Sequence, residues 1–357
     1  MNTDSHRCRG EFEARLLRLM PISVLAAIVS VFAGIALSVN PALLAADRCD
    51  TSSQRTKDDT VVYPVQNAAS PNDLSLIYDR SLPLDLQMEK RGGTDLYEVS
   101  YIKFASVNGE KVPGLYLTPR TYGMSGPFPA VVFMCGQGGR KEDVLLFADW
   151  FTREGFAVLS LDPQYHGERA RRDRRMFGGD VLTTIQAIRQ TVIDYRRGLD
   201  FLETRPEINQ DAIVYIGGSM GGIIGVVVAG GDRRIDAAVI TVAGGSWVDM
   251  ARSTIDPAVA ALKKFRIENG LNWDEVQRFF DPVDPINYIA SISPRPLLMI
   301  NGKHDIVVSP KTTKNLWELA GEPKEIWWLD YNHILPYEKL YPDIINWLYK
   351  ILPAAKK

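Results

Sequence analysis

The chain has 357 residues, of which 46% are hydrophobic and 24% charged, and its formal net charge is −2. This is the composition of an ordinary globular protein with enough apolar material for a large core. Affinity for the phosphate backbone of nucleic acids comes from clustered positive charge. The near-neutral balance therefore gives no reason to expect a nucleic-acid partner and favours a small molecule or an uncharged polymer.

The first 46 residues differ from the rest of the chain. Four arginines, at positions 7, 9, 15 and 18, precede a charge-free span over 19–46 that is most apolar at 22–39. Such a span, ending here in Ala45 and Ala46, is typical of an export signal, and it is also long enough to cross a bilayer as a helix. A buried core helix is the alternative.

In either of the first two cases the basic flank stays in the cytoplasm and the rest of the chain is exported. We therefore expect a periplasmic, extracellular or membrane-anchored protein that contacts a membrane only through residues 1–46, if these are not cleaved. Residues 47–75 are polar and lack an apolar period, which predicts a linker. The main domain is expected at 76–357.

The three cysteines, Cys8, Cys49 and Cys135, are too few for a disulfide framework. Cys8 lies in the leader. A bridge between Cys49 and Cys135 would tie a flexible arm to the sheet, so we expect both thiols to be free. No Cys/His spacing resembles a metal site, and the sequence implies no metal or other cofactor.

Apolar runs and helical periodicity alternate along the main domain. Strands are predicted at 97–106, 112–118, 130–134, 157–161, 212–216, 237–241, 296–300 and 325–329, with a hairpin turn at 107–110. Helices are predicted at 143–154, 181–204, 223–229, 310–320 and 342–351. This alternation indicates an α/β fold with a mostly parallel sheet covered by helices on both faces. Ligands of such sheets bind at the carboxyl ends of the strands.

An insertion over about 244–289 separates two of the predicted strands and is rich in large apolar residues. It is longer than a simple connection. We expect a small helical cap over the site. The alternative is a set of helices that pack away from it.

One serine stands in a glycine cluster between a predicted strand and a predicted buried helix. The sequence Gly217-Gly-Ser-Met-Gly221 has the Gly-x-Ser-x-Gly pattern of a nucleophile elbow. The turn of such an elbow is so tight that the residues two positions either side of the serine must lack bulk. We therefore expect Ser219 to be held out at the top of the sheet. A glycine-rich turn that binds phosphate or only packs is the alternative.

A serine nucleophile needs a base, which is usually an imidazole oriented by a carboxylate. Of the four histidines, His6 lies in the leader. His333 follows the last predicted strand and Asp305 follows the strand before it, so both reach the sheet edge that carries Ser219. The chain order Ser, Asp, His is the one this architecture imposes. His304 is expected to have no catalytic role, because adjacent residues in an extended segment point opposite ways.

Hydrolysis through an acyl intermediate also needs donors for the oxyanion, and two backbone N–H groups can supply them. One is expected from Met220, directly after the nucleophile. The other is expected from Gln137, in the glycine-rich loop 134–139. A plain strand-to-helix turn is the alternative for this loop.

Together these motifs resemble the α/β-hydrolase superfamily, and within it the branch of dienelactone hydrolases, acetyl xylan esterases and the catalytic domains of prolyl oligopeptidases. The likeness covers about 97–352 and rests on the motif around Ser219, on 162–168, on 294–305 and on the final Asn-His333. The family's oxyanion loop usually opens with His-Gly, whereas this chain has Cys135-Gly136. The stretch with His166 resembles a structural turn of the family, which implies no catalytic role for His166.

A run of five arginines follows that turn, at 169, 171, 172, 174 and 175. Such a run predicts a solvated loop. The sharper hypothesis is that one guanidinium, that of Arg169 for example, meets a substrate carboxylate near the mouth of the site.

Three functions fit these observations. The first is a serine hydrolase, a carboxylic ester hydrolase that acts on a small-molecule ester through an acyl-enzyme intermediate. The second is a peptidase of the prolyl-oligopeptidase type, although the segment before the hydrolase domain is too short for the β-propeller of that family. The third is a non-catalytic hydrolase-fold binding protein of the cell envelope. The sequence does not disclose the substrate or the oligomeric state.

Overall fold

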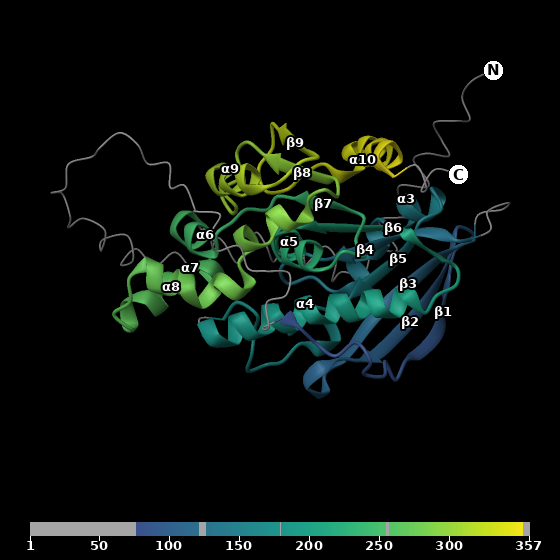
Figure 1. The fold of residues 1–357 in the computed structure, drawn as a ribbon, viewed down its shortest axis with the longest axis horizontal. Coiled ribbons are helices and arrows are strands. Elements are labelled where there is room, and N and C mark those ends of the chain that lie inside the picture. The colour runs from purple at the N-terminus through teal and green to yellow at the C-terminus, as the bar shows by residue number, and fades with distance from the viewer. Residues whose placement is uncertain (1–75, 121–125, 179, 255–256, 353–357) are drawn as a thin grey trace, which may run out of the picture. The chain divides into compact units, whose positions relative to one another are not determined.

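The computed structural model describes residues 76–120, 126–178, 180–254 and 257–352, and the side chains of these residues except 257–260 (Figure 1). The expected leader at 1–46, the expected linker at 47–75 and Cys49 lie outside the described residues. Within the described part of the chain, no helix combines the length and the apolar character needed to cross a bilayer.

The described strands form one sheet of nine, in the order β1-β2-β3-β5-β4-β6-β7-β8-β9. The pairs among β1, β2, β3 and β5 are antiparallel, and the pairs from β5 through β4 to β9 are parallel. This mostly parallel sheet with flanking helices confirms the predicted α/β fold. The strands are β1 (Gln87–Gly93), β2 (Tyr97–Ala105), β3 (Lys111–Pro119), β4 (Phe128–Met134), β5 (Ala157–Leu161), β6 (Ile208–Gly218), β7 (Ala237–Thr241), β8 (Leu297–Gly302) and β9 (Lys324–Leu329).

Burial explains which strands the sequence predicts well. Every residue of β4, β5 and β7 is buried, because helices cover both faces of the parallel part of the sheet, and these strands are therefore continuous apolar runs. β1 is exposed along its whole length and has the sequence Gln-Met-Glu-Lys-Arg-Gly-Gly. Sequence reasoning missed β1, because it carries no apolar pattern and is defined by its backbone pairing with β2.

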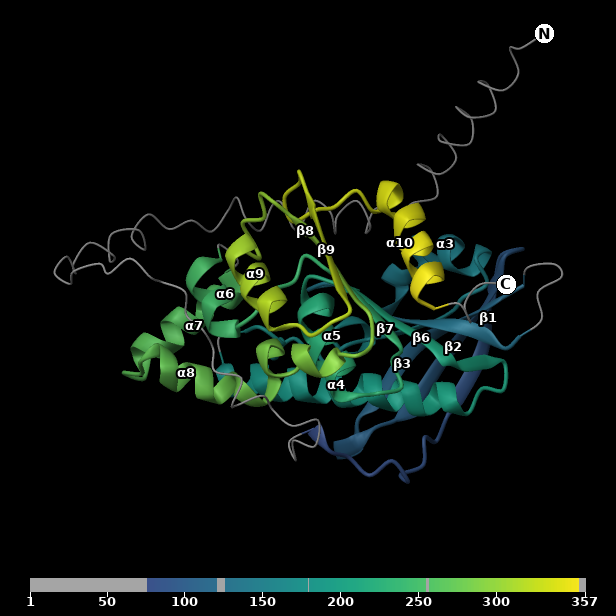
Figure 2. The same ribbon diagram turned by 45° about the horizontal axis from the view of Figure 1, so that its top comes forward.

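Helices cover both faces of the sheet (Figures 1 and 2). α4 (Val181–Glu203) and α5 (Met220–Gly231) lie side by side on one face, and α5 is buried along nearly its whole length, as its apolar sequence predicts. α3 (Ala148–Arg153) and α10 (Tyr337–Ile351) lie side by side on the other face. The rings of Trp150 and Tyr341 stack between these two helices, with centroids 5.1 Å apart. α9 (Pro310–Leu319) connects β8 to β9.

Two predicted helix boundaries are wrong. The helix predicted at 143–154 is a 3-10 helix, Lys141–Leu146, followed by α3. The helix predicted from residue 342 begins at Tyr337, and Pro342 lies inside it. Proline is over-represented in the first turn of helices, so a proline inside a helix makes the true start hard to find from the sequence.

The predicted insertion is helical. It contains α6 (Trp247–Ser253), α7 (Pro257–Glu268) and α8 (Trp273–Phe280). α6 borders a small cavity beside Ser219 through Trp247 and Met250. No described side chain of α7 or α8 borders this cavity or the larger one described below. Among the described side chains of the three helices, only those of α6 therefore take the place expected of a cap.

Candidate active site

Ser219 stands on a strained turn between β6 and α5. Its φ of 54° and ψ of −122° are unfavourable for a residue with a side chain. A β-carbon on Gly217 would lie 2.5 Å from the carbonyl oxygen of Gly221, and one on Gly221 would lie 2.3 Å from the carbonyl oxygen of Met134. Both positions therefore require glycine, which is the physical basis of the Gly-x-Ser-x-Gly pattern.

The three residues predicted to act together do meet. His333 Nε2 lies 2.9 Å from Ser219 Oγ, and His333 Nδ1 lies 2.7 Å from Asp305 Oδ2. Asp305 is buried, and its Oδ1 accepts the backbone N–H groups of Val307 and Val308, each at 2.9 Å. These bonds fix the carboxylate, so its Oδ2 can hold the imidazole with a proton on Nδ1 and a free lone pair on Nε2 facing the serine.

Sheet topology explains the meeting. Ser219 follows β6, Asp305 follows β8 and His333 follows β9. These three strands are parallel to one another in one sheet, in which β7 separates β6 from β8 and β8 pairs with β9. Their carboxyl ends therefore lie at the same edge, where α/β sheets bind ligands.

The other two described histidines lie apart from this group. His304 is exposed, and its Nε2 lies 2.7 Å from Asp330 Oδ1. His166 is buried, and its Nδ1 donates to the carbonyl oxygen of Gln164 at 2.9 Å. Burial lowers the pKa of His166. Among the described residues, neither ring forms a hydrogen bond with Ser219.

The two predicted oxyanion donors lie beside Ser219. Gln137, Met220 and Ser219 all border the same small cavity. Met220 is the first residue of α5, where a helix leaves its N–H groups without an intrahelical acceptor. The loop that holds Gln137 is closed by the N–H of Gly139, which donates to the carbonyl oxygen of Gly136 at 3.0 Å.

Sequence reasoning missed the anchor of this loop. The backbone N–H and the Nζ of Lys141 bind the two carboxylate oxygens of Asp162, at 2.8 and 3.0 Å, and both side chains are buried. Nζ also pairs with Glu142 at 2.8 Å and with Glu168 at 2.7 Å. Burial lowers the pKa of Lys141. The hydrogen bonds that its Nζ donates to Glu142 and Glu168, together with the charge of Asp162, outweigh burial and raise the pKa above its usual value. Asp162 follows β5 and therefore lies at the same sheet edge as Ser219. A carboxylate at this position is the sequence feature that could have indicated the anchor.

The hypothesis that Arg169 belongs to a solvated loop or meets a substrate is wrong. Arg169 is buried, and its guanidinium binds Asp194 at 2.6 Å and Glu110 at 3.1 Å. Asp194 lies on α4 and Glu110 follows the turn after β2, so neither partner is visible in the local sequence. The other four arginines of the run are exposed, as expected of a solvated loop.

Cys135 is a free, buried thiol, as predicted. Burial raises its pKa, and the nearby carboxylate of Asp143 adds to the effect. Among the described residues there is no cluster of three or more His, Cys, Asp or Glu side chains able to hold a metal ion.

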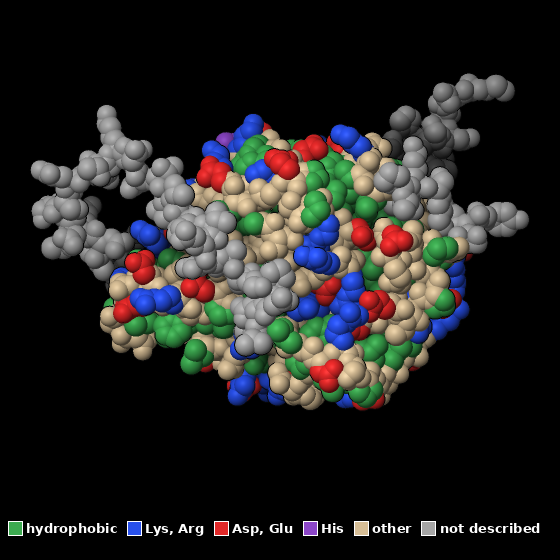
Figure 3. Space-filling model, viewed as in Figure 1, with side chains coloured by type: hydrophobic (Ala, Val, Ile, Leu, Met, Phe, Trp, Pro, Cys, Tyr) green, Lys and Arg blue, Asp and Glu red, His purple; other side chains and the backbone are tan. Residues whose placement is uncertain are grey.

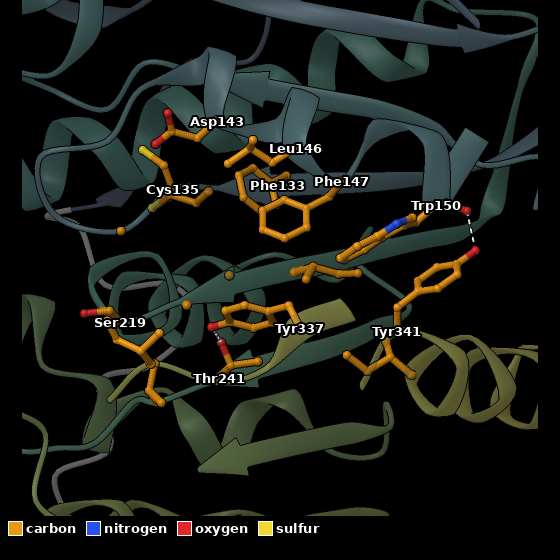
Figure 4. Close-up of a pocket in the computed structure, with 18 of the residues that line it drawn as sticks. Phe133, Cys135, Asp143, Leu146, Phe147, Trp150, Ser219, Thr241, Tyr337 and Tyr341 are labelled. Atoms are coloured by element: carbon orange, nitrogen blue, oxygen red, sulfur yellow. Dashed lines mark hydrogen bonds between the residues drawn. The ribbon is translucent and has the colours of Figure 1, made fainter. Parts of the chain in front are cut away.

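A cavity of about 330 Å³ opens beside Ser219 and His333, between α3 and α10. Figure 4 shows Ser219 at one end and the rings of Phe133, Phe147, Trp150 and Tyr337 along it. A second cavity of about 30 Å³ borders Ser219 and α6, and Ser219 is the lining residue that it shares with the first.

Comparisons with known proteins agree with this fold. Residues 113–256 match the model of the dienelactone hydrolase family. The uncharacterized protein YfhR of Escherichia coli is 25% identical over 259 residues, which are 72% of this chain and 81% of that protein. The putative hydrolase YtaP of Bacillus subtilis is 30% identical over 148 residues, 37% of this chain and 49% of that protein. The acetyl esterase Axe7A of Xylanibacter ruminicola is 23% identical over 262 residues, 69% of this chain and 58% of that protein.

Solved structures give the same answer for the fold. An acetyl xylan esterase from a Paenibacillus species is 21% identical with a TM-score of 0.66, and the match covers 84% of this chain and 97% of that one. Acetyl xylan esterase 1 from a Thermoanaerobacterium species is 19% identical with a TM-score of 0.65, covering 78% and 92%. The chain therefore has the fold of these structures, and its residues 113–256 resemble the dienelactone hydrolase family. Together these matches support a hydrolase.

Proposed function

We propose that the protein is a serine esterase that cleaves carboxylic esters through an acyl-enzyme intermediate. The observation that carries the proposal is the pair of contacts of His333, with Nε2 2.9 Å from Ser219 Oγ and Nδ1 2.7 Å from Asp305 Oδ2. A hydroxyl, an imidazole and a buried carboxylate in this order are the groups that acyl transfer by serine needs.

In the first half of the reaction, His333 Nε2 takes the proton of Ser219 as Oγ bonds to the ester carbonyl carbon. The carbonyl oxygen becomes an oxyanion that accepts the N–H groups of Met220 and Gln137. Asp305 stabilises the imidazolium that has formed. The intermediate collapses when the bond to the alcohol oxygen breaks and His333 returns its proton to that oxygen, which leaves the acyl group on Ser219.

In the second half, a water molecule takes the place of the alcohol. His333 removes one of its protons while the water oxygen bonds to the acyl carbon, and the same two N–H groups stabilise the second oxyanion. Collapse breaks the bond to Oγ, and the proton on His333 restores the hydroxyl of Ser219. The products are the acid, the alcohol and the free enzyme.

The strands that come before β4 in the chain favour an ester over a peptide as the substrate. β1, β2 and β3 belong to the main sheet, so the described residues before β4 form no blades of a propeller. The esterases named among the relatives and the solved structures point the same way. The acylaminoacyl peptidase of Pyrococcus horikoshii, 16% identical with a TM-score of 0.56 over 73% of this chain and 43% of that one, shares the fold alone.

We also propose that residues 1–46 direct export and leave the hydrolase domain outside the cytoplasm, and that no nucleic acid is bound. Positive and negative side chains are mixed on the face shown in Figure 3, which fits a protein without a phosphate-binding surface. Cell fractionation tests the export proposal, and recovery of the hydrolase domain in the cytoplasm alone would contradict it.

The test of the main proposal uses the full-length chain, p-nitrophenyl acetate and an aminoacyl p-nitroanilide. We expect turnover of the ester, and Ser219→Ala is expected to lower it by roughly 10⁴-fold or more. Ser81→Ala, an exposed serine on a turn, is the matched control and is expected to keep full activity. Preference for the anilide would support the peptidase, and no turnover of either compound would support the binding protein.

A further inference from the structure

We infer that the site selects esters of a short acyl group with an apolar alcohol. This inference rests on the proposed esterase function and adds the substrate class. It depends on two cavities of very different size, about 330 Å³ and about 30 Å³, that have Ser219 as their shared lining residue.

The large cavity is mainly apolar, although Asp143 and Thr241 also line it beside Ser219 and His333. The side chains that form its walls are mainly aromatic and aliphatic, among them Phe133, Phe147, Trp150, Ile216, Tyr337 and Ile344. Its two tyrosine hydroxyls are already engaged. Tyr337 Oη lies 2.9 Å from Thr241 Oγ1, and Tyr341 Oη donates to the carbonyl oxygen of Trp150 (Figure 4).

A sugar placed in this cavity would lose hydrogen bonds to water without gaining equivalent ones, which is costly. An alkyl or aryl group would gain the free energy of leaving water, about 0.8 kcal/mol per buried CH₂. The cavity therefore fits an apolar group better than a carbohydrate.

The small cavity has room for little more than a methyl group, because a volume of about 10–15 Å³ already holds one water. Trp247 and Met250 of α6 and Phe177 form part of its wall. Phe177 packs against Trp247 with ring centroids 5.5 Å apart. An acetyl group fits here, and a longer acyl chain would require these side chains to move.

The proton transfers decide which part of the ester enters which cavity. The alcohol oxygen must lie beside His333 Nε2 to receive its proton, and His333 borders the large cavity. The oxyanion must lie beside the N–H groups of Met220 and Gln137, which border the small cavity. The alcohol therefore extends into the large cavity, and the acyl group remains on the side of the small one.

The mouth of the large cavity is apolar as well. Leu146 and Ile334 line the cavity and are 57% and 53% exposed. Leu145, the neighbour of Leu146, is also exposed at 41% but does not line the cavity. The pair Leu146 and Leu145 therefore provides a matched test and control on one segment.

The experiment compares two isomeric esters, hexyl acetate and ethyl hexanoate, with the full-length enzyme. They share composition and similar ester reactivity, and differ in whether the long chain is the alcohol or the acyl group. We expect kcat/KM to be at least about 10-fold higher for hexyl acetate, the size of discrimination that pocket fit achieves. Acetylated xylose is expected to be a poorer substrate than hexyl acetate.

Substitutions at the two cavities test which cavity receives the alcohol and which receives the acyl group. Leu146→Trp is expected to lower the ratio of kcat/KM for hexyl acetate to that for ethyl acetate by about 10-fold, and Leu145→Trp is expected to leave it unchanged. Phe177→Ala enlarges the small cavity and is expected to raise kcat/KM for ethyl hexanoate relative to hexyl acetate.

Three outcomes would overturn the inference. Equal or better turnover of ethyl hexanoate by the wild type would reverse the assignment while leaving the esterase function intact. An unchanged ratio in Leu146→Trp would show that the alcohol does not enter the large cavity. Absence of any Ser219-dependent ester hydrolysis would overturn the inference together with the proposed function.

Discussion

Two histidine–aspartate pairs stand near the same sheet edge, and only one is built to hold an imidazole in place. His333–Asp305 and His304–Asp330 have the same N–O distance of 2.7 Å. The side chain of Asp305 is 3% exposed, whereas that of Asp330 is 81% exposed. An exposed pair gains little because water and salt screen it. The buried carboxylate of Asp305, by contrast, cannot rotate away from the ring.

The two pairs give a direct prediction. Asp305→Asn should lower kcat/KM for an ester by about 10³–10⁴-fold, because the amide favours the wrong tautomer of His333. Asp330→Asn should leave the rate within about twofold, since an exposed contact of this kind contributes little and His304 forms no hydrogen bond with Ser219 among the described residues. Steady-state kinetics of both variants on one ester checks this. Equal losses in the two variants would show that Asp305 has no orienting role.

Residue chemistry explains why these side chains could be predicted from the sequence. Ser219 has a local glycine pattern, and with only four histidines in the chain elimination leads to His333. Lys141 and Arg169 gave no comparable signal. Their partners Asp162 and Asp194 are 21 and 25 residues away, so their burial depends on tertiary contacts that no local pattern encodes.

At the scale of elements, the elbow depends on close contact between α5 and the loop after β4. Gly221 lies so near this loop that a β-carbon would stand 2.3 Å from Met134 O and 2.7 Å from Cys135 O. A substitution there would push the loop that carries Gln137. Gly231, at the other end of α5, has no heavy atom within 4 Å of the β-carbon position.

Gly221→Ala is therefore expected to lower the free energy of unfolding by about 1–3 kcal/mol, the usual cost of overpacking, and to reduce esterase activity. Gly231→Ala should be neutral or stabilise by up to about 1 kcal/mol, because alanine suits a helix better than glycine. Urea unfolding of the two variants measures both effects. If Gly221→Ala left the free energy of unfolding unchanged, the contact between Gly221 and the loop after β4 would be less close than described.

A buried carboxylate ties α6 to the segment after α8. Asp284 is fully buried and accepts the N–H of Trp247 at 2.9 Å, Gln277 Nε2 at 3.0 Å and the N–H of Ile286 at 3.2 Å. Burial raises its pKa to about 7. The folded protein therefore binds a proton at pH values where the unfolded chain, with a pKa near 3.9, has released it.

The sign of the pH effect follows from this proton. The contribution of Asp284 to stability is fully present below the unfolded pKa and is lost as the pH rises toward 7. Relative to wild type, Asp284→Asn should gain stability between pH 4 and pH 7.5, by on the order of a few kcal/mol. Asp274→Asn changes an exposed position on α8. Its stability relative to wild type should stay constant over the same pH range. If the stability of Asp284→Asn relative to wild type also stayed constant over this pH range, the account would be contradicted.

Elements with a regular apolar pattern could be predicted from the sequence. Elements that form through pairing with a neighbouring strand, without such a pattern, could not. β5 and β7 coincide with their predicted ranges because burial on both faces makes each an unbroken apolar run. β1 has no such run. The predicted start of α10 is five residues late, and the proline inside the helix, Pro342, lies where the first helical turn would be expected.

At the scale of the whole molecule, the sheet joins groups that are distant in the chain. His333 is 114 residues from Ser219 and 28 from Asp305. Because parallel strands deliver their following loops to one edge, this meeting could be predicted from strand order. The two cavities could not, since their walls combine α3, α6, α10 and two loops whose packing the sequence pattern does not specify.

The central claim is that His333 makes Ser219 a nucleophile. Fluorophosphonate labelling of the full-length protein, read by intact mass and peptide mapping, tests this most directly, because only an activated serine reacts rapidly. We predict one adduct, on the peptide that contains Ser219, and a large fall in its rate of formation in His333→Ala. Folded wild-type protein that forms no adduct, or forms it on another serine, would contradict the account.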